Sequence, residues 1–164
     1  MDTKVLLPII GITAYRVGAT VLNRRLTPTV PGCLQIFYAD NSECIFNLHV
    51  TPNGQRCPVK EITKRLNQRA RCLATMQGKA DCLTLSSDSD RKFAGAVHTA
   101  DFVFMYSSGT EAPAFADEAF LLTTLMKARG VLSKEEMLAT QQRLTLDSPT
   151  YNEHLHQLFS ASRW

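Results

Sequence analysis

The sequence has no pair of cysteines in a CxxC spacing. Zinc ribbons and thioredoxin-like redox sites depend on that spacing, so neither is supported. The cysteines that are present are odd in number and mostly stand beside apolar residues. They are Cys33, Cys44, Cys57, Cys72 and Cys82. We expect them to be free, buried thiols in a reducing compartment, the cytoplasm.

Motifs that hold phosphates, metals or nucleic acids are also missing. The run Ser107–Thr110 lacks the flanking pattern of a Walker A loop or a nucleophile elbow. The aspartates around Asp88 do not follow the EF-hand pattern. His154 and His156 are two residues apart, which places them on different faces of a predicted helix. No helix-turn-helix, zinc-finger or RRM signature occurs. The sequence therefore predicts no metal site and no cofactor.

A long uninterrupted apolar run is lacking as well. Residues 5–22 are apolar, but Pro8 and Arg16 interrupt them. The segment is at the short end for a membrane span, and a charge near the centre of a span costs about 2.5–3.5 kcal/mol. Three interpretations stay open for these residues: a helix of the core, a strand followed by a helix, or an N-terminal membrane anchor. We take the core interpretation as the leading one and expect no membrane contact.

Charge is distributed unevenly along the chain. Residues 1–80 contain 11 Lys and Arg against 4 Asp and Glu, whereas residues 81–164 contain 7 against 11. A chain of 164 residues with 45% hydrophobic content can build one core, so we expect a single domain over 1–164. The charge split indicates an anionic partner for the basic half, or contact between the two halves.

Two stretches predict β-hairpins. Residues 33–40 and 43–51 are rich in aromatic and β-branched residues, and Asp40, Asn41 and Ser42 between them favour a turn. The second hairpin is predicted over about 82–106, with one strand at 82–87, another at 96–106, and a polar loop at 88–95 between them. A helix is predicted between the hairpins over 58–79, because Pro58 fits a first helical turn and apolar residues then recur at helical spacing.

The C-terminal third predicts helices. Phe115, Ala119, Leu122 and Met126 form one apolar stripe, Ser133 and Glu136 form a capping box, and a last helix starts near Pro149. We expect two to three helices over 112–164, packed on the rest of the chain or on a partner. Hairpin, helix, hairpin and helices together predict an α+β fold with an antiparallel sheet.

The helix at 58–79 carries six basic residues and one acidic residue. Like charges four residues apart destabilise a helix slightly. Several of them on one helix therefore indicate that these cations contact a partner. An anionic partner would neutralise them, either through phosphates or through carboxylates. The leading interpretation is nevertheless that these side chains form a solvated face. The candidate contact residues are Arg56, Lys60, Lys64, Arg65, Gln68, Arg69 and Arg71.

His49 and Thr51 form an H-x-T pattern, in which a histidine could move a proton and a threonine could hold a phosphate. Two such patterns facing each other make the site of the 2H phosphoesterases. The only possible second copy, around His98, reads H-T-A, so its Thr99 would face away from His98 on a strand. Ordinary strand histidines are therefore the leading interpretation.

Several predicted strands are apolar on both faces. Phe102, Phe104 and Tyr106 alternate with Val103 and Met105. Such strands are covered on both sides, and in a short chain one cover could be a partner subunit. The leading interpretation is thus a non-enzymatic regulatory or accessory protein in an assembly, with a protein partner or a second copy of itself. The basic helix would contact nucleic acid or an acidic protein. One alternative is a small phosphoesterase or nuclease using His49 and His98. The other is an N-terminally membrane-anchored accessory protein.

Overall fold

The computed structural model describes residues 2–40, 43–64, 84–87, 92–99, 101–110, 112, 114–136, 138 and 149–163. The fold is α+β. Its centre is an antiparallel sheet of five strands in the order β2-β1-β5-β4-β3. The strands are β1 (Gly32–Tyr38), β2 (Cys44–Val50), β3 (Thr84–Ser87), β4 (Lys92–His98) and β5 (Phe102–Ser108).

The first hairpin is confirmed. β1 pairs with β2 from Gly32 opposite Val50 to Phe37 opposite Cys44, and a register shift follows Ile36. β1 also pairs with β5 along its whole length, from Gly32 opposite Ser108 to Tyr38 opposite Phe102. β1 and β5 are therefore central strands, and β2 is an edge strand.

The second predicted hairpin is present as the antiparallel pair of β3 and β4, but its strand bounds differ from the prediction. Residues 96–106 do not form one strand but belong to two, β4 and β5, because the chain turns at Thr99 and Asp101. The side chain of Thr99 accepts a hydrogen bond from the Phe102 N–H at 3.2 Å, and the Thr99 N–H donates to the Phe102 carbonyl at 2.9 Å. The run of residues 96–106 is apolar enough to predict one strand, but this local polar turn divides it into two. The predicted loop at 88–95 likewise gives way to strand from Lys92 onward.

Residues 5–22 belong to one helix, α1 (Thr3–Asn23). The side chain of Asp2 caps it by accepting a hydrogen bond from the Lys4 N–H at 3.0 Å. Pro8 lies inside the helix, where it removes a single backbone hydrogen bond. One face of α1 is buried on the sheet, and this burial stabilises the helix despite the proline. The buried residues are Leu6, Ile10, Thr13, Ala14, Val17, Gly18 and Val21.

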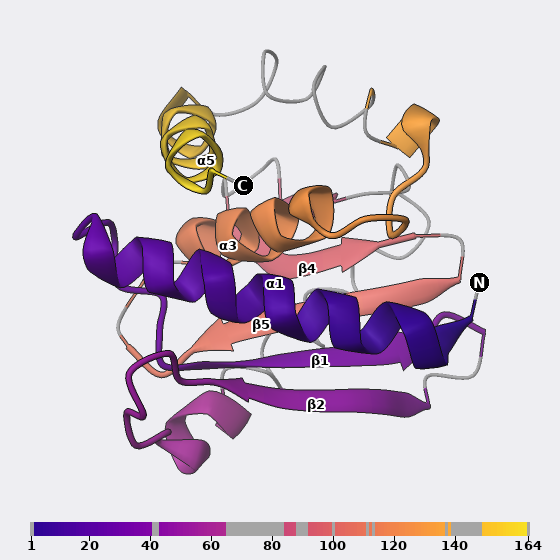
Figure 1. Cartoon of the computed structure of the whole chain (residues 1–164), viewed down its shortest axis with the longest axis horizontal. Coiled ribbons are helices and arrows are strands. Elements are labelled where there is room, and N and C mark those ends of the chain that lie inside the picture. The colour runs from indigo at the N-terminus through magenta and orange to yellow at the C-terminus, as the bar shows by residue number, and fades with distance from the viewer. Residues whose placement is uncertain are drawn as a thin grey trace.

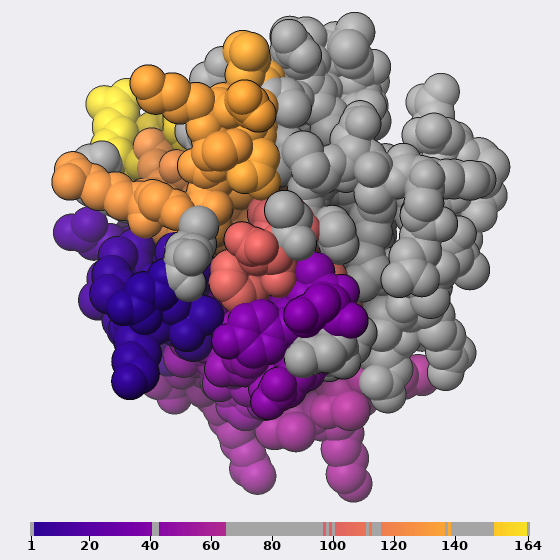
Figure 2. Space-filling view, turned by 90° about the vertical axis from the view of Figure 1, so that its right-hand side faces the viewer, coloured from indigo at the N-terminus to yellow at the C-terminus, as the bar shows by residue number. Residues whose placement is uncertain are grey.

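Two long helices complete this side of the sheet, α3 (Ala114–Lys127) and α5 (Pro149–Ala161). α3 contacts β4, β5 and α1, and α5 packs mainly on α3 (Figure 1). The predicted capping box is confirmed: the Glu136 N–H donates to the Ser133 side chain at 3.1 Å, and the Ser133 N–H donates to Glu136 at 3.0 Å. α3 and α5 thus pack on this chain's own core. Figure 2 shows α1 and the C-terminal helices gathered on one side of the strands.

The opposite face of the sheet is covered in part by the segment after β2. Residues 59–64 are helical. The buried Ile62 packs with Cys33 and Met105, and Cys57 adds to this cluster. The central strands are therefore covered on both faces, as their apolar composition predicts. At this cluster the sheet face opposite α1 is covered by residues of the same chain, not by a partner.

Tyr106 occupies the centre of the larger core and is fully buried. Its ring stacks on Phe120 of α3 with centroids 4.4 Å apart, and its hydroxyl donates a hydrogen bond to the Thr29 carbonyl. A Cβ atom on Gly32 would overlap that hydroxyl. Gly32 has no side chain, and it therefore leaves the space that the Tyr106 hydroxyl occupies.

We expect Gly32→Ala to destabilise the protein by about 1–3 kcal/mol, because the methyl group displaces the Tyr106 hydroxyl. Gly11→Ala is the matched control. A Cβ at Gly11 of α1 would make only ordinary contacts, 3.5 Å from Leu48 and Phe46. The control should be neutral or stabilising by up to about 1 kcal/mol, since alanine is the better helix former. Urea unfolding of both variants measures the difference, and equal stabilities would contradict the role of Gly32.

Candidate functional site

The outer face of α1 is apolar and exposed. Val5 is 59% exposed, Ile12 63% and Tyr15 36%. These residues make up three of the five large hydrophobic side chains that are exposed among the described residues. A helix at the surface of a monomer normally presents polar residues to solvent, so this apolar outer face is the candidate contact surface.

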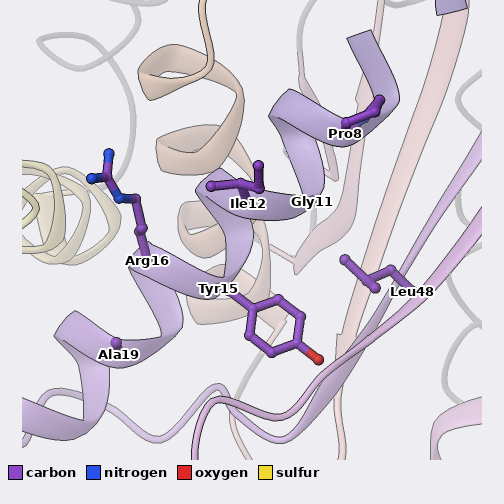
Figure 3. Close-up of a pocket in the computed structure, with 7 residues that line it drawn as sticks. All are labelled: Pro8, Gly11, Ile12, Tyr15, Arg16, Ala19 and Leu48. Atoms are coloured by element: carbon purple, nitrogen blue, oxygen red, sulfur yellow. The ribbon is translucent and has the colours of Figure 1, made fainter. Parts of the chain in front are cut away.

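This face borders a groove between α1 and the edge strand β2. Its volume is about 630 Å³. Leu48 of β2 points toward α1 and forms the far wall (Figure 3). Gly11 keeps the groove open, since its position has no side chain to fill the space beside Leu48. The groove is lined by Pro8, Gly11, Ile12, Tyr15, Arg16, Ala19 and Leu48.

Tyr15 is held in place by β2. Its hydroxyl donates a hydrogen bond to the His49 carbonyl at 2.7 Å and lies 3.4 Å from the Thr51 hydroxyl. The ring of Tyr15 therefore reaches from α1 toward β2, as Figure 3 shows. An aromatic side chain fixed at its polar end loses little conformational freedom when a partner packs on its ring.

The predicted basic helix is described only in its first part. Arg56, Lys60 and Lys64 are all exposed, and Ile62 turns inward to the sheet. Ile62 thus lies on the buried side, as the predicted apolar stripe requires, but Val59 of the same predicted stripe is 56% exposed. The other candidate contacts, Arg65, Gln68, Arg69 and Arg71, lie outside the described residues.

The two histidines of the phosphoesterase hypothesis lie on different strands. His49 in β2 is opposite Cys33 of β1, while His98 in β4 is opposite Val103 of β5. β1 and β5 lie between them, which separates their backbones by about 14 Å across the sheet. The register adds about 13 Å along the strands. Thr51 is half-buried beside Tyr15. The structure therefore does not bring His49 and His98 together.

Metal ligands do not converge in the part of the chain that the structure describes. There, no group of three His, Cys, Asp or Glu side chains is placed to hold a metal ion. His154 and His156 both lie on α5, the first half-buried and the second exposed. Burial lowers the pKa of His154 from its ordinary value, which favours its neutral form in the folded protein.

The thiol of Cys33, on the sheet face opposite α1, has a strongly shifted pKa. Burial raises its pKa to about 12, and the neighbouring Cys57 and Cys44 add smaller effects in the same direction. The Cys33 thiol donates to the Asn47 side chain at 2.9 Å. A neutral thiol held in this way is a poor nucleophile, so Cys33 is a structural residue rather than a reactive one.

We expect iodoacetamide at pH 8 to modify the exposed Cys44 at an ordinary rate and Cys33 about a thousandfold more slowly, because a three-unit rise in pKa removes the thiolate. Peptide mapping by mass spectrometry measures both rates, and unfolding in urea should make them equal. The same shift lowers stability as the pH rises from about 9 to 12, because the unfolded thiol loses a proton that the folded one keeps. Equal rates in the folded protein would contradict the burial of Cys33.

α1 is also long and apolar enough to cross a membrane, with a mean hydropathy of 1.8. In the fold, 44% of that apolar window is buried inside the protein. The buried part is the face that packs on β2, α3 and α5. α1 is therefore a core helix with an apolar outer side.

Comparison with protein-family models, with curated protein sequences and with solved structures found no match to this chain. Function is therefore inferred from the surface of the molecule alone.

The sequence did not reveal the groove, although the residues of α1 that line it belong to a segment recognised as apolar. The groove does have a signal in the sequence: apolar residues recur every three or four positions at Val5, Pro8, Ile12, Tyr15 and Ala19. The buried residues of α1 follow a similar spacing on the other side. Two overlapping apolar patterns look like one uniformly apolar stretch until the helix is placed on its sheet.

Proposed function

We propose that the protein is a non-enzymatic binding module of a protein assembly, which contacts its partner through the outer face of α1. The observation that carries this proposal is the exposure of Val5, Ile12 and Tyr15 beside an apolar groove. Soluble proteins rarely leave such a patch open unless something binds it. The three described cysteines, Cys33, Cys44 and Cys57, are free, which supports a reducing compartment such as the cytoplasm.

A photo-crosslinking amino acid at position 12 tests this proposal. In cells that express the protein, we expect Ile12→benzoylphenylalanine to form a discrete adduct with a second protein, because the side chain lies in the proposed contact. The matched control is the same change at Leu138, which is 56% exposed and does not line the groove. Gel mobility and mass spectrometry identify the adducts. A variant at position 12 that forms no protein adduct would contradict the proposed function.

The second contact of the proposed module is the basic surface formed by the exposed residues Arg56, Lys60 and Lys64. Its charge supports an anionic partner, either nucleic acid or an acidic protein. Phosphate contacts make binding to nucleic acid strongly dependent on salt, and this property separates the two classes of partner.

We expect the protein to bind duplex oligonucleotides at low salt in a fluorescence-anisotropy titration. The logarithm of the association constant should fall as the logarithm of the salt concentration rises, by about 0.9 for each neutralised phosphate. Lys60→Glu combined with Lys64→Glu should weaken binding and flatten that slope. The control is Arg129→Glu with Lys134→Glu, which changes the net charge equally at two other exposed positions. If no binding occurs at low salt, the nucleic-acid contact is wrong and an acidic protein is the partner to seek.

A phosphoesterase would need His49 and His98 at one phosphate. The backbone separation given above does not supply that arrangement. No observation on the described residues favours a catalytic function over binding, so the enzymatic alternative is not developed further.

A further inference from the structure

The sheet face opposite α1 carries exposed polar side chains at its β2 edge. Leu48 of β2 points toward α1 and lines the groove. Successive residues of a strand point to opposite faces, so the side chains of Asn47 and His49 lie on the other face. They share that face with Cys33, which is opposite His49 in the register. Both Asn47 and His49 are exposed, and the contact proposed for α1 uses neither side chain.

The amide of Asn47 is oriented by a buried thiol. The Cys33 thiol donates a hydrogen bond to the side-chain oxygen of Asn47 at 2.9 Å. The two N–H groups of the amide therefore lie on the arm that points away from Cys33. Because Asn47 is exposed, these donors are accessible to a partner. An amide that is already fixed in this way loses little conformational freedom when it donates to a carbonyl or phosphate oxygen.

The ring of His49 lies beside this amide, two residues further along β2. It is exposed on the same face. Aromatic side chains, including histidine, stack on unpaired bases in nucleic-acid-binding proteins. Asn47 and His49 thus place a hydrogen-bonding group and a stacking group next to each other on one rigid strand.

The segment after β2 brings a cation to the same end of the sheet. The Cys57 sulfur lies 3.9 Å from the Gly32 carbonyl oxygen. Gly32 is opposite Val50, the residue that follows His49 and ends β2. Arg56, which precedes Cys57, therefore lies close to the end of the strand that carries His49.

Two further cations extend this positive surface. Lys60 and Lys64 belong to the helical residues 59–64, and Ile62 of that segment packs on the same sheet face as Cys33. Lys60 and Lys64 are exposed, and neither pairs with a carboxylate of the described residues. The segment contains one acidic residue, Glu61. The positive charge is therefore in excess, and an anionic partner would neutralise it.

An apolar side chain stands among these cations. Val59 directly precedes Lys60 and is 56% exposed. The carboxylates of an acidic protein would gain nothing from Val59. A nucleotide offers an apolar base face and a charged phosphate together, so a base can pack on Val59 while its phosphate contacts Lys60. In a duplex the faces of the bases are stacked on each other, and only an unpaired base can make this contact.

From these contacts we infer that this surface binds single-stranded nucleic acid. The cations contact phosphates, the Asn47 amide donates to a base carbonyl, and His49 and Val59 pack on base faces. The phosphates supply most of the affinity, and the bases supply the preference for an unpaired strand. The inference rests on the basic contact of the proposed function and names its ligand. We call the following residues the strand-binding surface: Asn47, His49, Arg56, Val59, Lys60 and Lys64.

The test is a fluorescence-anisotropy titration of the full-length protein with three probes of about ten nucleotides. The first is a single strand of DNA, the second is the same strand paired with its complement, and the third is an abasic strand that keeps only sugars and phosphates. We expect the single strand to bind about tenfold more tightly than either other probe, because only it offers unpaired bases. The single strand and the abasic strand should depend similarly on salt, since their phosphates are the same.

Asn47→Asp removes the two amide donors but keeps an oxygen that accepts from the Cys33 thiol. It should weaken binding of the single strand by about tenfold or more. Asn53→Asp is the matched control, because Asn53 is exposed in the turn after β2 and the change in charge is the same. The control should weaken binding by less than about threefold. With the abasic strand the two variants should be equivalent, a pattern that loss of folding cannot produce.

Three results would overturn the inference. The first is equal affinity for the single strand and the abasic strand, which would limit the contact to phosphates. The second is tighter binding of the duplex than of the single strand. The third is an equal effect of Asn47→Asp and Asn53→Asp on the single strand. Each of these results leaves the basic contact of the proposed function standing.

A different result would reject more than this inference. If polyglutamate binds and none of the nucleic-acid probes does, the nucleic-acid contact itself is wrong and the basic surface takes an acidic protein. If neither polyglutamate nor any probe binds at low salt, the basic surface is not a contact for an anionic partner. The crosslink from position 12 tests the contact through α1 independently of both results.

Discussion

The hydrogen bond from the Tyr106 hydroxyl to the Thr29 carbonyl is the constraint on which the helical side of the fold depends. It joins the central strand β5 to the segment that leads from α1 into β1, while the ring of Tyr106 stacks on Phe120 of α3. A phenol buried completely must have a partner for its hydroxyl, and the Thr29 carbonyl is that partner. The pKa of Tyr106 is raised by this burial and by the nearby Asp117, so the hydroxyl keeps its proton and remains a donor.

α1 depends on this arrangement and serves two purposes at once. Its inner face supplies Ile10, Ala14 and Val17 to the core, and each is fully buried. Its outer face is equally apolar and borders the groove. The same helix that completes the fold therefore also presents the proposed contact, and a substitution on either face acts on a different property. Inner residues govern stability, whereas in the proposed function outer residues govern recognition.

Local patterns predicted much of this fold from the sequence. The first hairpin and the Ser133–Glu136 capping box follow from short-range chemistry, and both are confirmed. The division of residues 96–106 into two strands was missed, because the turn at Thr99 depends on hydrogen bonds that become visible only when β4 and β5 pair. The groove was missed for a related reason: the residues of α1 and Leu48 are far apart in sequence, and only the packing of α1 beside β2 brings them together.

The bond from Tyr15 to the His49 carbonyl has a consequence for the solubility of the protein. β2 has a neighbouring strand on one side only, and a bare strand edge is a template on which other chains add as further strands. The Tyr15 hydroxyl donates to one backbone carbonyl near the end of that edge, and α1 lies alongside the strand. Any event that lifts α1 away, such as proteolysis of the N-terminal segment, therefore uncovers this edge. Other chains can then add to it as further strands, and the protein can aggregate edge to edge.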